Sequence, residues 1–163
     1  VRAPAIEVYN LVTEDLGYNA VTIPYSDLYT SMQTGVCDGW IGGTPQLNYS
    51  DFKDVIKYYV AYNCFAENIG FFMSQSVADE MPAEYVTAIE EAFAAASAES
   101  FETAKALDEK ALKGLEEYGV KIINLTDAEM AACVEKIQKE TWPKLYKNIG
   151  EDTLKELVAA LEE

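Results

Sequence analysis

The spacing of apolar residues changes repeatedly along the first 40 positions of the chain. Val1-Arg2-Ala3 is expected to end a strand, and short runs typical of β-strands occur at 21–23 and 36–37. Between these runs apolar side chains recur every three or four residues, which predicts helices with one buried face. Pro4 and Ser26 suit the first turns of these helices, and Gly17 and Gly35 suit their ends. The pattern therefore predicts alternating strands and helices.

The next segment carries turn signals and two further apolar runs. Asp38-Gly39-Trp40 leads into Gly42-Gly43, where the backbone can closely approach a ligand or a neighbouring strand. Ser50-Asp51 predicts a short capped turn. Two runs rich in β-branched and aromatic residues then predict strands at 55–62 and 69–73.

A long helical pattern follows these strands. From 83 to 118 apolar residues recur at helical spacing, and Gly119 ends the pattern. About 35 residues at 1.5 Å per residue span roughly 50 Å, which favours a helix that bends or bridges two lobes. A strand is expected at 120–125.

The C-terminal segment is predicted to be helical. Thr126-Asp127-Ala128-Glu129 is a capping box that begins a helix at 127–140. Further helices are expected from about Trp142 and at 152–161, with Gly150 between them. Because strands alternate with helices along the chain, the predicted fold class is α/β.

Composition narrows the possible functions. Of the 163 residues 28 are acidic and 12 are basic, which gives a formal charge of −16. Such a surface repels phosphate backbones and anionic bilayers, so binding to nucleic acid or membrane surfaces is not expected. No apolar run is long enough to span a bilayer, and no signal-peptide pattern opens the chain. Because the chain begins at Val1 without a methionine, we expect a processed or truncated product.

The sequence matches no common type of catalytic centre. Histidine is absent, which removes the commonest general base and metal ligand. GxSxG, P-loop, GxGxxG and HExxH motifs are also absent. Cys37, Cys64 and Cys133 lack metal-binding spacing and are expected to be small buried apolar residues. Asp38 stands alone beside glycine, which is more typical of a structural residue than of a general acid or base. We therefore expect no enzyme, no cofactor and no metal site.

One cation and several aromatic residues could form a small-molecule site. Arg2 is the only arginine, and a guanidinium binds a carboxylate through paired hydrogen bonds and stays charged when partly buried. Tyr25, Trp40, Asn63 and Phe65 lie at the ends of predicted strands or in the loops after them, where open α/β sheets bind ligands. The alternatives are that Arg2 is an ordinary surface residue and that most of the aromatic residues fill the core.

Three blocks of the sequence resemble a known family of binding proteins. The blocks are Val1-Arg2-Ala3-Pro4, Ile23-Pro24-Tyr25-Ser26-Asp27-Leu28-Tyr29 and Met32-Gln33-Thr34-Gly35-Val36-Cys37-Asp38-Gly39. In sequence and spacing they resemble the substrate-binding subunits of TRAP transporters, the DctP-like proteins. The similarity continues through Phe52-Lys53-Asp54-Val55, Tyr62-Asn63 and Met81-Pro82 into the long helix. It covers essentially the whole chain but only the C-terminal half or so of a family member.

This resemblance implies a periplasmic-binding-protein-like fold with two α/β lobes. Residues 1–67 and 108–163 would form the second lobe, and residues 68–107 would cross into a first lobe that is mostly missing. The long helix would span both lobes. Without the first lobe, the strand at 69–73 would be an apolar edge. We therefore expect self-association through residues 68–107.

The resemblance also implies an extracytoplasmic protein that binds a small organic acid and delivers it to a membrane permease. In family members an arginine matching Arg2 forms a salt bridge with the substrate carboxylate, and an aromatic residue matching Tyr25 packs on the ligand. Gly42 stands where many members have an asparagine, so Trp40 would supply a wall there instead. Two alternatives remain: a ligand-sensing or protein-interaction α/β module, and an enzyme that uses carboxylates only, which the absent motifs disfavour.

Overall fold

The computed structural model describes residues 1–65 and 70–161. In chain order its elements are β1 (Arg2–Ala3), α1 (Glu7–Asp15), β2 (Val21–Thr22), α2 (Tyr25–Gln33), α3 (Pro45–Leu47), the π-helix η1 (Asn48–Phe52), β3 (Tyr58–Ala61), α4 (Gln75–Glu80), α5 (Ala83–Tyr118), β4 (Lys121–Asn124), α6 (Asp127–Glu140), α7 (Trp142–Ile149) and α8 (Glu151–Leu161). Short strands joined by helices confirm the α/β class. None of the helices within the described residues is long and apolar enough to cross a membrane.

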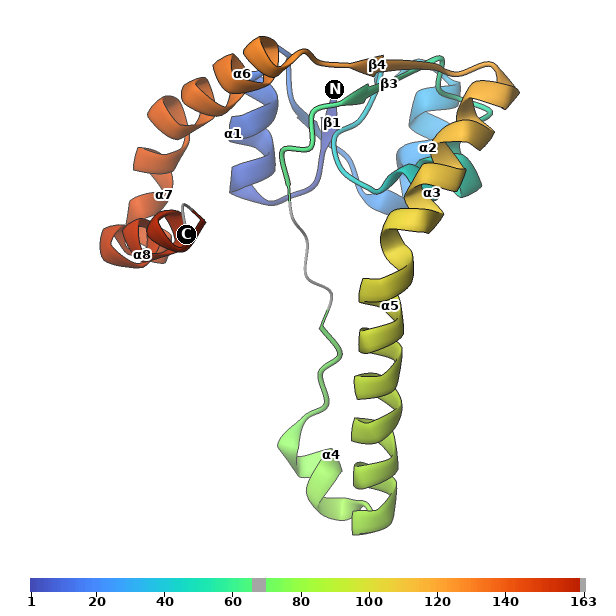
Figure 1. Ribbon diagram of the computed structural model, residues 1–163, viewed down its shortest axis with the longest axis vertical. Coiled ribbons are helices and arrows are strands. Elements are labelled where there is room, and N and C mark those ends of the chain that lie inside the picture. Colours follow the sequence, from blue (N-terminus) through green and yellow to red (C-terminus); the bar gives the residue numbers. More distant parts are fainter. Residues whose placement is uncertain (66–69, 162–163) are drawn as a thin grey trace.

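The strands form two parallel pairs. β1 pairs with β2, with Arg2 opposite Val21, and Arg2 also forms a parallel bridge with Trp40. β3 pairs with β4, with Tyr58 opposite Lys121. The strands of each pair are joined by a helical crossover, through α1 for β1 and β2 and through α4 and α5 for β3 and β4, which is the kind of connection that parallel strands need. Figure 1 shows α1 and α2 below β3 and β4 and on either side of β1, and α6 leading away toward α7 and α8.

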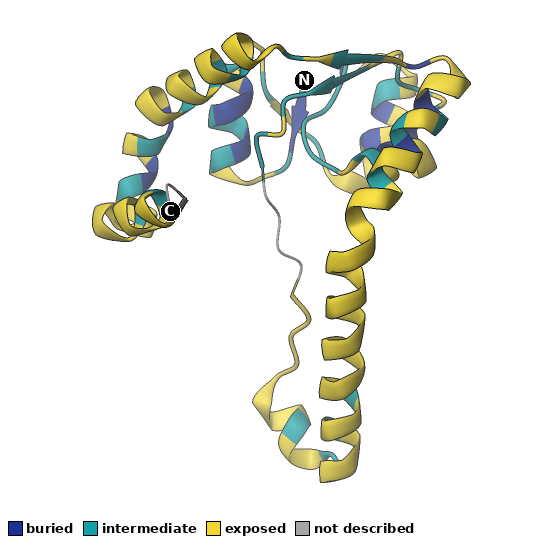
Figure 2. Ribbon diagram, in the orientation of Figure 1, coloured by how far each residue is buried: buried dark blue, intermediate teal, exposed yellow. Residues whose placement is uncertain are grey.

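The long helix α5 is present over the predicted residues. Its 36 residues extend roughly 54 Å at 1.5 Å per residue, and it ends where Gly119 adopts a left-handed conformation at φ 104°. Only its C-terminal part is anchored in the lobe, where Ala111 and Leu115 are buried and Asp108 accepts a hydrogen bond from the Gln46 N–H at 3.2 Å. Residues 70–107, which we call the arm, project away from the lobe and are largely exposed (Figures 1 and 2).

A core cluster of the fold is formed by α2 and the segments that follow it. Leu28, Cys37 and Phe52 are buried there, and the half-buried apolar residues packed on them are Ile23, Met32, Trp40, Val55 and Ile56. Leu28 from α2 is fully buried, so its removal would cost about 2–5 kcal/mol through lost transfer energy and a residual cavity. Cys37 is buried as expected, whereas Cys64 and Cys133 are half-buried, and all three are free thiols.

The helix ends seen in the structure agree only in part with those predicted from the sequence. The capping box is confirmed, because Thr126 Oγ1 accepts from the Glu129 N–H and the Glu129 carboxylate accepts from the Thr126 N–H. The Ser26 cap is wrong, because α2 begins at Tyr25 after Pro24 and the Ser26 hydroxyl bonds to Asp27 instead. Helix α1 begins at Glu7, later than Pro4 suggested.

Two predictions around the glycine loop are wrong. Val36 and Cys37 form a bend, not a strand, because Arg2 pairs with the chain three residues further on, at Trp40. The turn predicted from Ser50-Asp51 belongs to a helical segment that begins earlier, at Pro45, where the Thr44 hydroxyl caps the Leu47 N–H.

The predicted strands after Val55 are shorter than expected. The first covers only Tyr58–Ala61. Residues 70–73 are not a strand, because none of the described residues pairs with them, and Phe71 and Phe72 are exposed. Ile69 and the boundary between residues 67 and 68 lie outside the described residues.

Candidate ligand-binding site

Arg2 is held in place by backbone contacts on both sides of β1. Its N–H donates to the Gly39 C=O at 2.8 Å, and its C=O accepts from the Ile41 N–H at 3.0 Å. Its side-chain Nε donates to the Ile23 C=O at 2.8 Å. The guanidinium therefore occupies one fixed position at the point where the first strands meet.

The Arg2 guanidinium is buried without a counter-ion among the described residues. Only 5% of Arg2 is exposed, and the ion pairs of residues 1–65 and 70–161 join Lys147 to Glu7 and Lys155 to Glu151. Burial lowers the pKa of Arg2, while the nearby Tyr25 opposes that shift. Because arginine remains protonated even so, the site carries a desolvated positive charge that an anion would stabilise.

Aromatic rings border this cation. The Arg2 Cζ lies 5.9 Å from the centre of the Tyr25 ring, within the range of a cation–π contact. Tyr25 meets Trp40 edge-on at 6.3 Å and Phe52 edge-on at 6.0 Å, and Trp40 and Phe52 lie 4.9 Å apart. The Tyr25 hydroxyl donates to Asp51 at 3.4 Å, and burial, with help from Asp51, raises the pKa of Tyr25.

The loop after Trp40 holds the indole ring in position. Its Nε1–H donates to Asn48 Oδ1 at 3.1 Å, and the buried Asn48 amide donates in turn to the Thr44 C=O at 3.0 Å. The ring lies against Gly43, where a Cβ would come within 2.4 Å of Trp40 Cη2. Gly43 also has φ +73°, a conformation that favours glycine. Both properties allow the indole to pack on its own loop.

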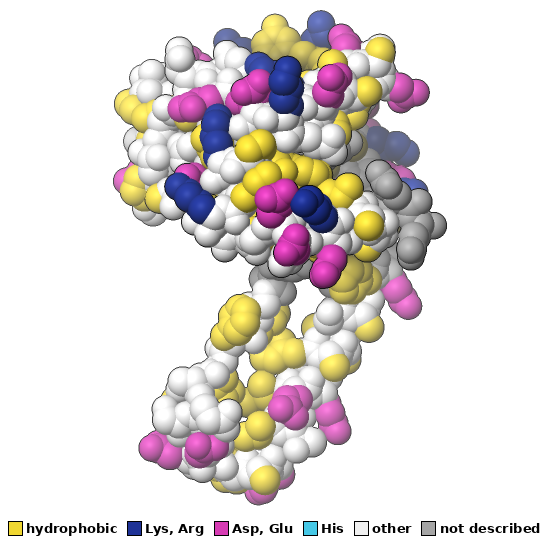
Figure 3. Space-filling view, turned by 90° about the vertical axis from the view of Figure 1, so that its left-hand side faces the viewer, with side chains coloured by type: hydrophobic (Ala, Val, Ile, Leu, Met, Phe, Trp, Pro, Cys, Tyr) yellow, Lys and Arg dark blue, Asp and Glu magenta, His cyan; other side chains and the backbone are white. Residues whose placement is uncertain are grey.

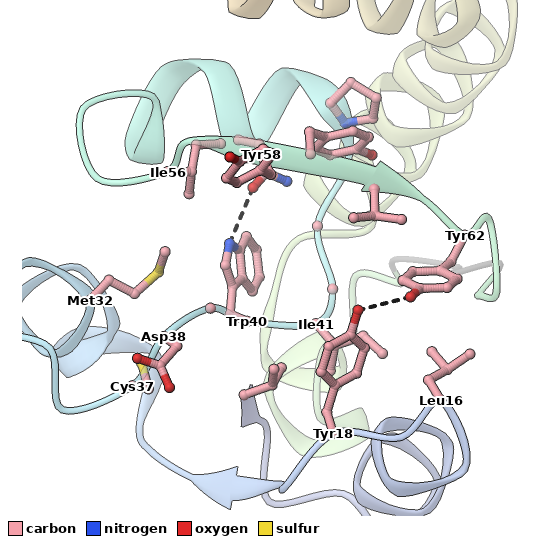
Figure 4. A pocket seen from close by; sticks show the side chains of 18 of the residues that line it. Leu16, Tyr18, Met32, Cys37, Asp38, Trp40, Ile41, Ile56, Tyr58 and Tyr62 are labelled. Carbon is pink, nitrogen blue, oxygen red and sulfur yellow. Dashed lines mark hydrogen bonds between the residues drawn. The ribbon is translucent and has the colours of Figure 1, made fainter. Parts of the chain in front are cut away.

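A cavity of about 760 Å³ lies on the side of Trp40 toward β3. Figure 4 shows Trp40 and Ile41 on one side of it and β3 with Tyr58 on the other. Of the predicted site residues, Trp40, Gly42, Asn63 and Phe65 line this cavity, and the lining residues include neither Arg2 nor Tyr25. The predicted residues thus form two groups: Arg2 with Tyr25, and those around the cavity. Trp40 belongs to both.

Two of the predicted site residues, Asn63 and Phe65, lie in the segment after β3. Phe65 stacks on Tyr9 of α1, with ring centres 4.1 Å apart and an angle of 18°. Asn63 has φ 48°, the left-handed region that asparagine tolerates better than most residues. Its side chain is exposed. One face of the Phe65 ring is therefore covered by Tyr9, whereas the Asn63 side chain, which also lines the cavity, is accessible to solvent.

Several residues that shape the site were not identified from the sequence. They are Tyr9, Asn48, Asp51 and Phe52. Thr44-Pro45, a capping residue before a proline at the first helical position, was the available signal for the short helix that carries Asn48. The contacts of Phe52 and Tyr9 are made across the fold and have no local sequence signal.

The fold and site together define a class of protein. Strand–helix units, a buried arginine at their strand ends and a long helix that leaves the lobe are the features of one half of a two-lobed solute-binding protein. The comparison with families agrees: the chain belongs to the bacterial extracellular solute-binding protein family 7, DctP, whose profile matches residues 1–148.

Solved structures show the same fold. A TRAP periplasmic solute-binding protein from Sulfurospirillum deleyianum, with bound succinate, is 26% identical, covers 97% of the chain and has a TM-score of 0.81. One from Shewanella oneidensis, also with succinate, is 23% identical over 98% of the chain, with a TM-score of 0.82. DctPAm from Advenella mimigardefordensis, in complex with galactonate, is 22% identical over 99%, with a TM-score of 0.80. In each case the chain spans 52% of the matched structure. None of the curated protein sequences compared with the chain matches it.

Proposed function

We propose that this chain is part of an extracytoplasmic solute-binding protein that binds a small organic acid and delivers it to a TRAP membrane permease. The observation that carries the proposal is the buried Arg2 guanidinium, which has no carboxylate partner within the described residues. An incoming carboxylate would form the paired charge-assisted hydrogen bonds that this group lacks. The matched proteins with bound succinate and galactonate support an acid as the ligand.

Each predicted residue has a part in this proposal. Arg2 binds the carboxylate, and Tyr25 packs beside the guanidinium. Trp40 forms an apolar wall, and Gly42 leaves that wall uncovered. Asn63 and Phe65 border the adjoining cavity. The chain performs no catalysis in this proposal: binding energy closes two lobes around the ligand, and closure presents the ligand to the permease.

The test measures acid binding by calorimetry on the protein encoded by the complete reading frame. Arg2→Ala should weaken binding by about 2–5 kcal/mol, because the carboxylate loses its charged partner. Arg2→Lys keeps the charge but loses the planar fork, so it should be intermediate. Tyr25→Phe is the matched control, since it keeps the ring beside Arg2 and removes only the weak contact with Asp51. Unchanged affinity in folded Arg2→Lys and Arg2→Ala would remove Arg2 from the site.

We further propose the lobe assignment expected from the sequence, with residues 1–67 and 108–163 in one lobe and residues 68–107 as the crossover. The hydrogen bond between Gln46 and Asp108 supports the second boundary, because it anchors α5 where the helix enters the lobe. On the arm, Phe71 stacks on Phe93 with ring centres 4.2 Å apart, yet Phe72 is 96% exposed. This apolar surface supports self-association of the 163-residue chain through the arm.

The charge of the arm makes this association dependent on salt. Between residues 70 and 104 there is no lysine or arginine, and the acidic residues are Asp79, Glu80, Glu84, Glu90, Glu91, Glu99 and Glu102. Figure 3 shows hydrophobic side chains along the arm with acidic ones toward its end. Because salt screens repulsion between two copies, association should strengthen as ionic strength rises.

Sedimentation velocity over a range of chain and salt concentrations tests this. Phe72→Glu should shift the chain toward monomer, because it places a charge in the apolar contact. Val36→Glu, at a position that is 68% exposed on the lobe, is the matched control and should change nothing. A monomer at high chain concentration and high salt would contradict self-association.

A further inference from the structure

Four aromatic rings form a row that starts beside the Arg2 guanidinium. The first ring is Tyr25, whose centre lies 5.9 Å from Arg2 Cζ, and the second is Trp40, whose centre lies 6.3 Å from that of Tyr25. The row continues with Tyr9 and ends at Phe65, and the centres of these last two rings are 4.1 Å apart. An anion bound at Arg2 would therefore have aromatic surface beside it.

Gly42 lies where the second ring of the row meets the third. A Cβ on Gly42 would be 3.4 Å from Trp40 Cζ3 and 3.7 Å from Tyr9 Cε1, so both rings border the space that a side chain at this position would occupy. Gly42 also has φ +120°, a conformation that favours glycine. Because glycine has no side chain, this part of the site presents ring atoms and no side-chain hydrogen-bonding group.

The side-chain donors of the first two rings are engaged inside the lobe. The Trp40 Nε1–H donates to Asn48 Oδ1 at 3.1 Å, which Figure 4 draws as a dashed line. The Tyr25 hydroxyl donates to Asp51 at 3.4 Å. Of the Arg2 side chain, only Nε has a hydrogen bond within residues 1–65 and 70–161, which leaves the two Nη groups for an anion. The site thus offers one group that binds a carboxylate, followed by ring surface whose donors are occupied.

These features suit an acid that has one carboxylate and a flat apolar body. The faces of aromatic rings carry partial negative charge, so a second carboxylate placed over them would be repelled and would lose its hydration. The hydroxyl groups of a sugar acid would be buried against the rings without partners, which is also costly. A flat apolar ring, in contrast, gains contact with the row, and its removal from water is favourable.

We propose that the preferred ligand of this site is an aromatic monocarboxylate, with its carboxylate on Arg2 and its ring against Trp40. The assignment rests on the proposed function, because it requires that Arg2 binds an acid, and it adds the class of acid. It differs from the succinate and galactonate found in two of the matched structures. Trp40 is the residue that determines specificity on this lobe, since its indole is held by Asn48 and lies over Gly42.

Calorimetry with four acids tests the proposal on the protein encoded by the complete reading frame. Phenylacetate should bind about tenfold or more tightly than succinate or galactonate, and about threefold more tightly than cyclohexylacetate, whose ring is not flat. Equal or tighter binding of succinate or galactonate would overturn the aromatic assignment and leave the proposed function standing. Equal binding of cyclohexylacetate would also overturn it. If the folded protein binds none of the four acids, the proposed function and this assignment both fail.

A substitution of Trp40 provides an independent test. Trp40→Leu keeps an apolar side chain but removes the flat ring, so it should lower the ratio of phenylacetate affinity to succinate affinity about fivefold. Trp142→Leu is the matched control, because it makes the same change at the other tryptophan, on α7, and it should leave this ratio within about twofold. A purely structural effect of Trp40→Leu would weaken both acids alike. An unchanged ratio in folded Trp40→Leu would therefore overturn the proposal.

Discussion

Gly43→Ala should displace the Trp40 ring and destabilise the lobe more than its backbone conformation alone explains. Two costs add at this position. An alanine at φ +73° costs about 1–2 kcal/mol, because its Cβ approaches the following carbonyl. The new Cβ would also lie 2.4 Å from Trp40 Cη2 and 3.1 Å from Leu47 Cδ2, and overpacking of this kind costs about 1–3 kcal/mol. The expected loss is about 2–5 kcal/mol.

Gly35→Ala is the matched control for the backbone term. Gly35 has φ +75°, but nothing lies within 4 Å of its added Cβ. It should therefore lose only about 1–2 kcal/mol. The difference between the two substitutions, about 1–3 kcal/mol, measures how firmly the indole is held against its loop.

Urea unfolding followed by circular dichroism measures both free energies. In a Trp40→Ala background the ring is gone and only the 3.1 Å approach to Leu47 Cδ2 remains, so the extra cost of Gly43→Ala over Gly35→Ala should be much smaller than in the wild-type chain. Equal losses for Gly43→Ala and Gly35→Ala in the wild-type chain, within about 0.5 kcal/mol, would refute the reasoning. The Trp40 ring would then be free to move, and it could not serve as a fixed wall beside Arg2.

Two further predictions concern hydrogen bonds. Tyr18→Phe and Tyr62→Phe each remove the same 2.8 Å bond, so each should cost about 1 kcal/mol and the double variant no more than either single one; additive losses in urea unfolding would contradict this. Hydrogen bonds from Thr126 hold the pKa of Glu129 below its ordinary value of 4.5. The stability that Glu129 has over Glu129→Gln should therefore be fully present above pH 4.5 and disappear as pH falls through the lowered pKa. Thermal unfolding between pH 7 and pH 3 measures this, and a constant difference would contradict it.

The parts of the fold that the sequence predicted well are governed by local interactions. Helix α5 follows an apolar repeat that Gly119 ends with a left-handed turn. The capping box at Thr126 and Glu129 is likewise complete within four residues. Such signals need no knowledge of distant segments, because the energies that set them arise within one or two helical turns.

The errors lie where a distant partner decides the structure. Val36 and Cys37 look as much like a strand as Trp40 does, but Arg2 selects Trp40 through backbone bonds on either side of it. Phe71 and Phe72 have strand-forming side chains and no strand beside them in the described part of the fold. A strand is stabilised by its neighbour, so its limits cannot be found from its own residues.

The same distinction applies to the candidate site. Arg2 was singled out because of its chemistry, and the structure shows it buried beside Tyr25. Asn48 was missed because its importance comes only from the hydrogen bond to Trp40, eight residues away. Sequence reasoning can therefore identify the group that would bind the ligand more readily than the groups that hold it in position.

The overall charge and the charge of the site have opposite signs, and this separates two stages of binding. With a net charge of −16, the surface of the protein repels an approaching organic acid. Water and salt weaken this repulsion, and at physiological ionic strength the screening length is about 8 Å. At Arg2 the surroundings are buried, so screening is weak and attraction to one carboxylate is strong. In the proposed function, repulsion would therefore act mainly on the rate of approach, whereas Arg2 would act on how long the acid stays. The planar guanidinium of Arg2 suits an anion that presents two oxygens, as a carboxylate does, better than a monatomic anion, because the paired oxygens match it in geometry as well as in charge.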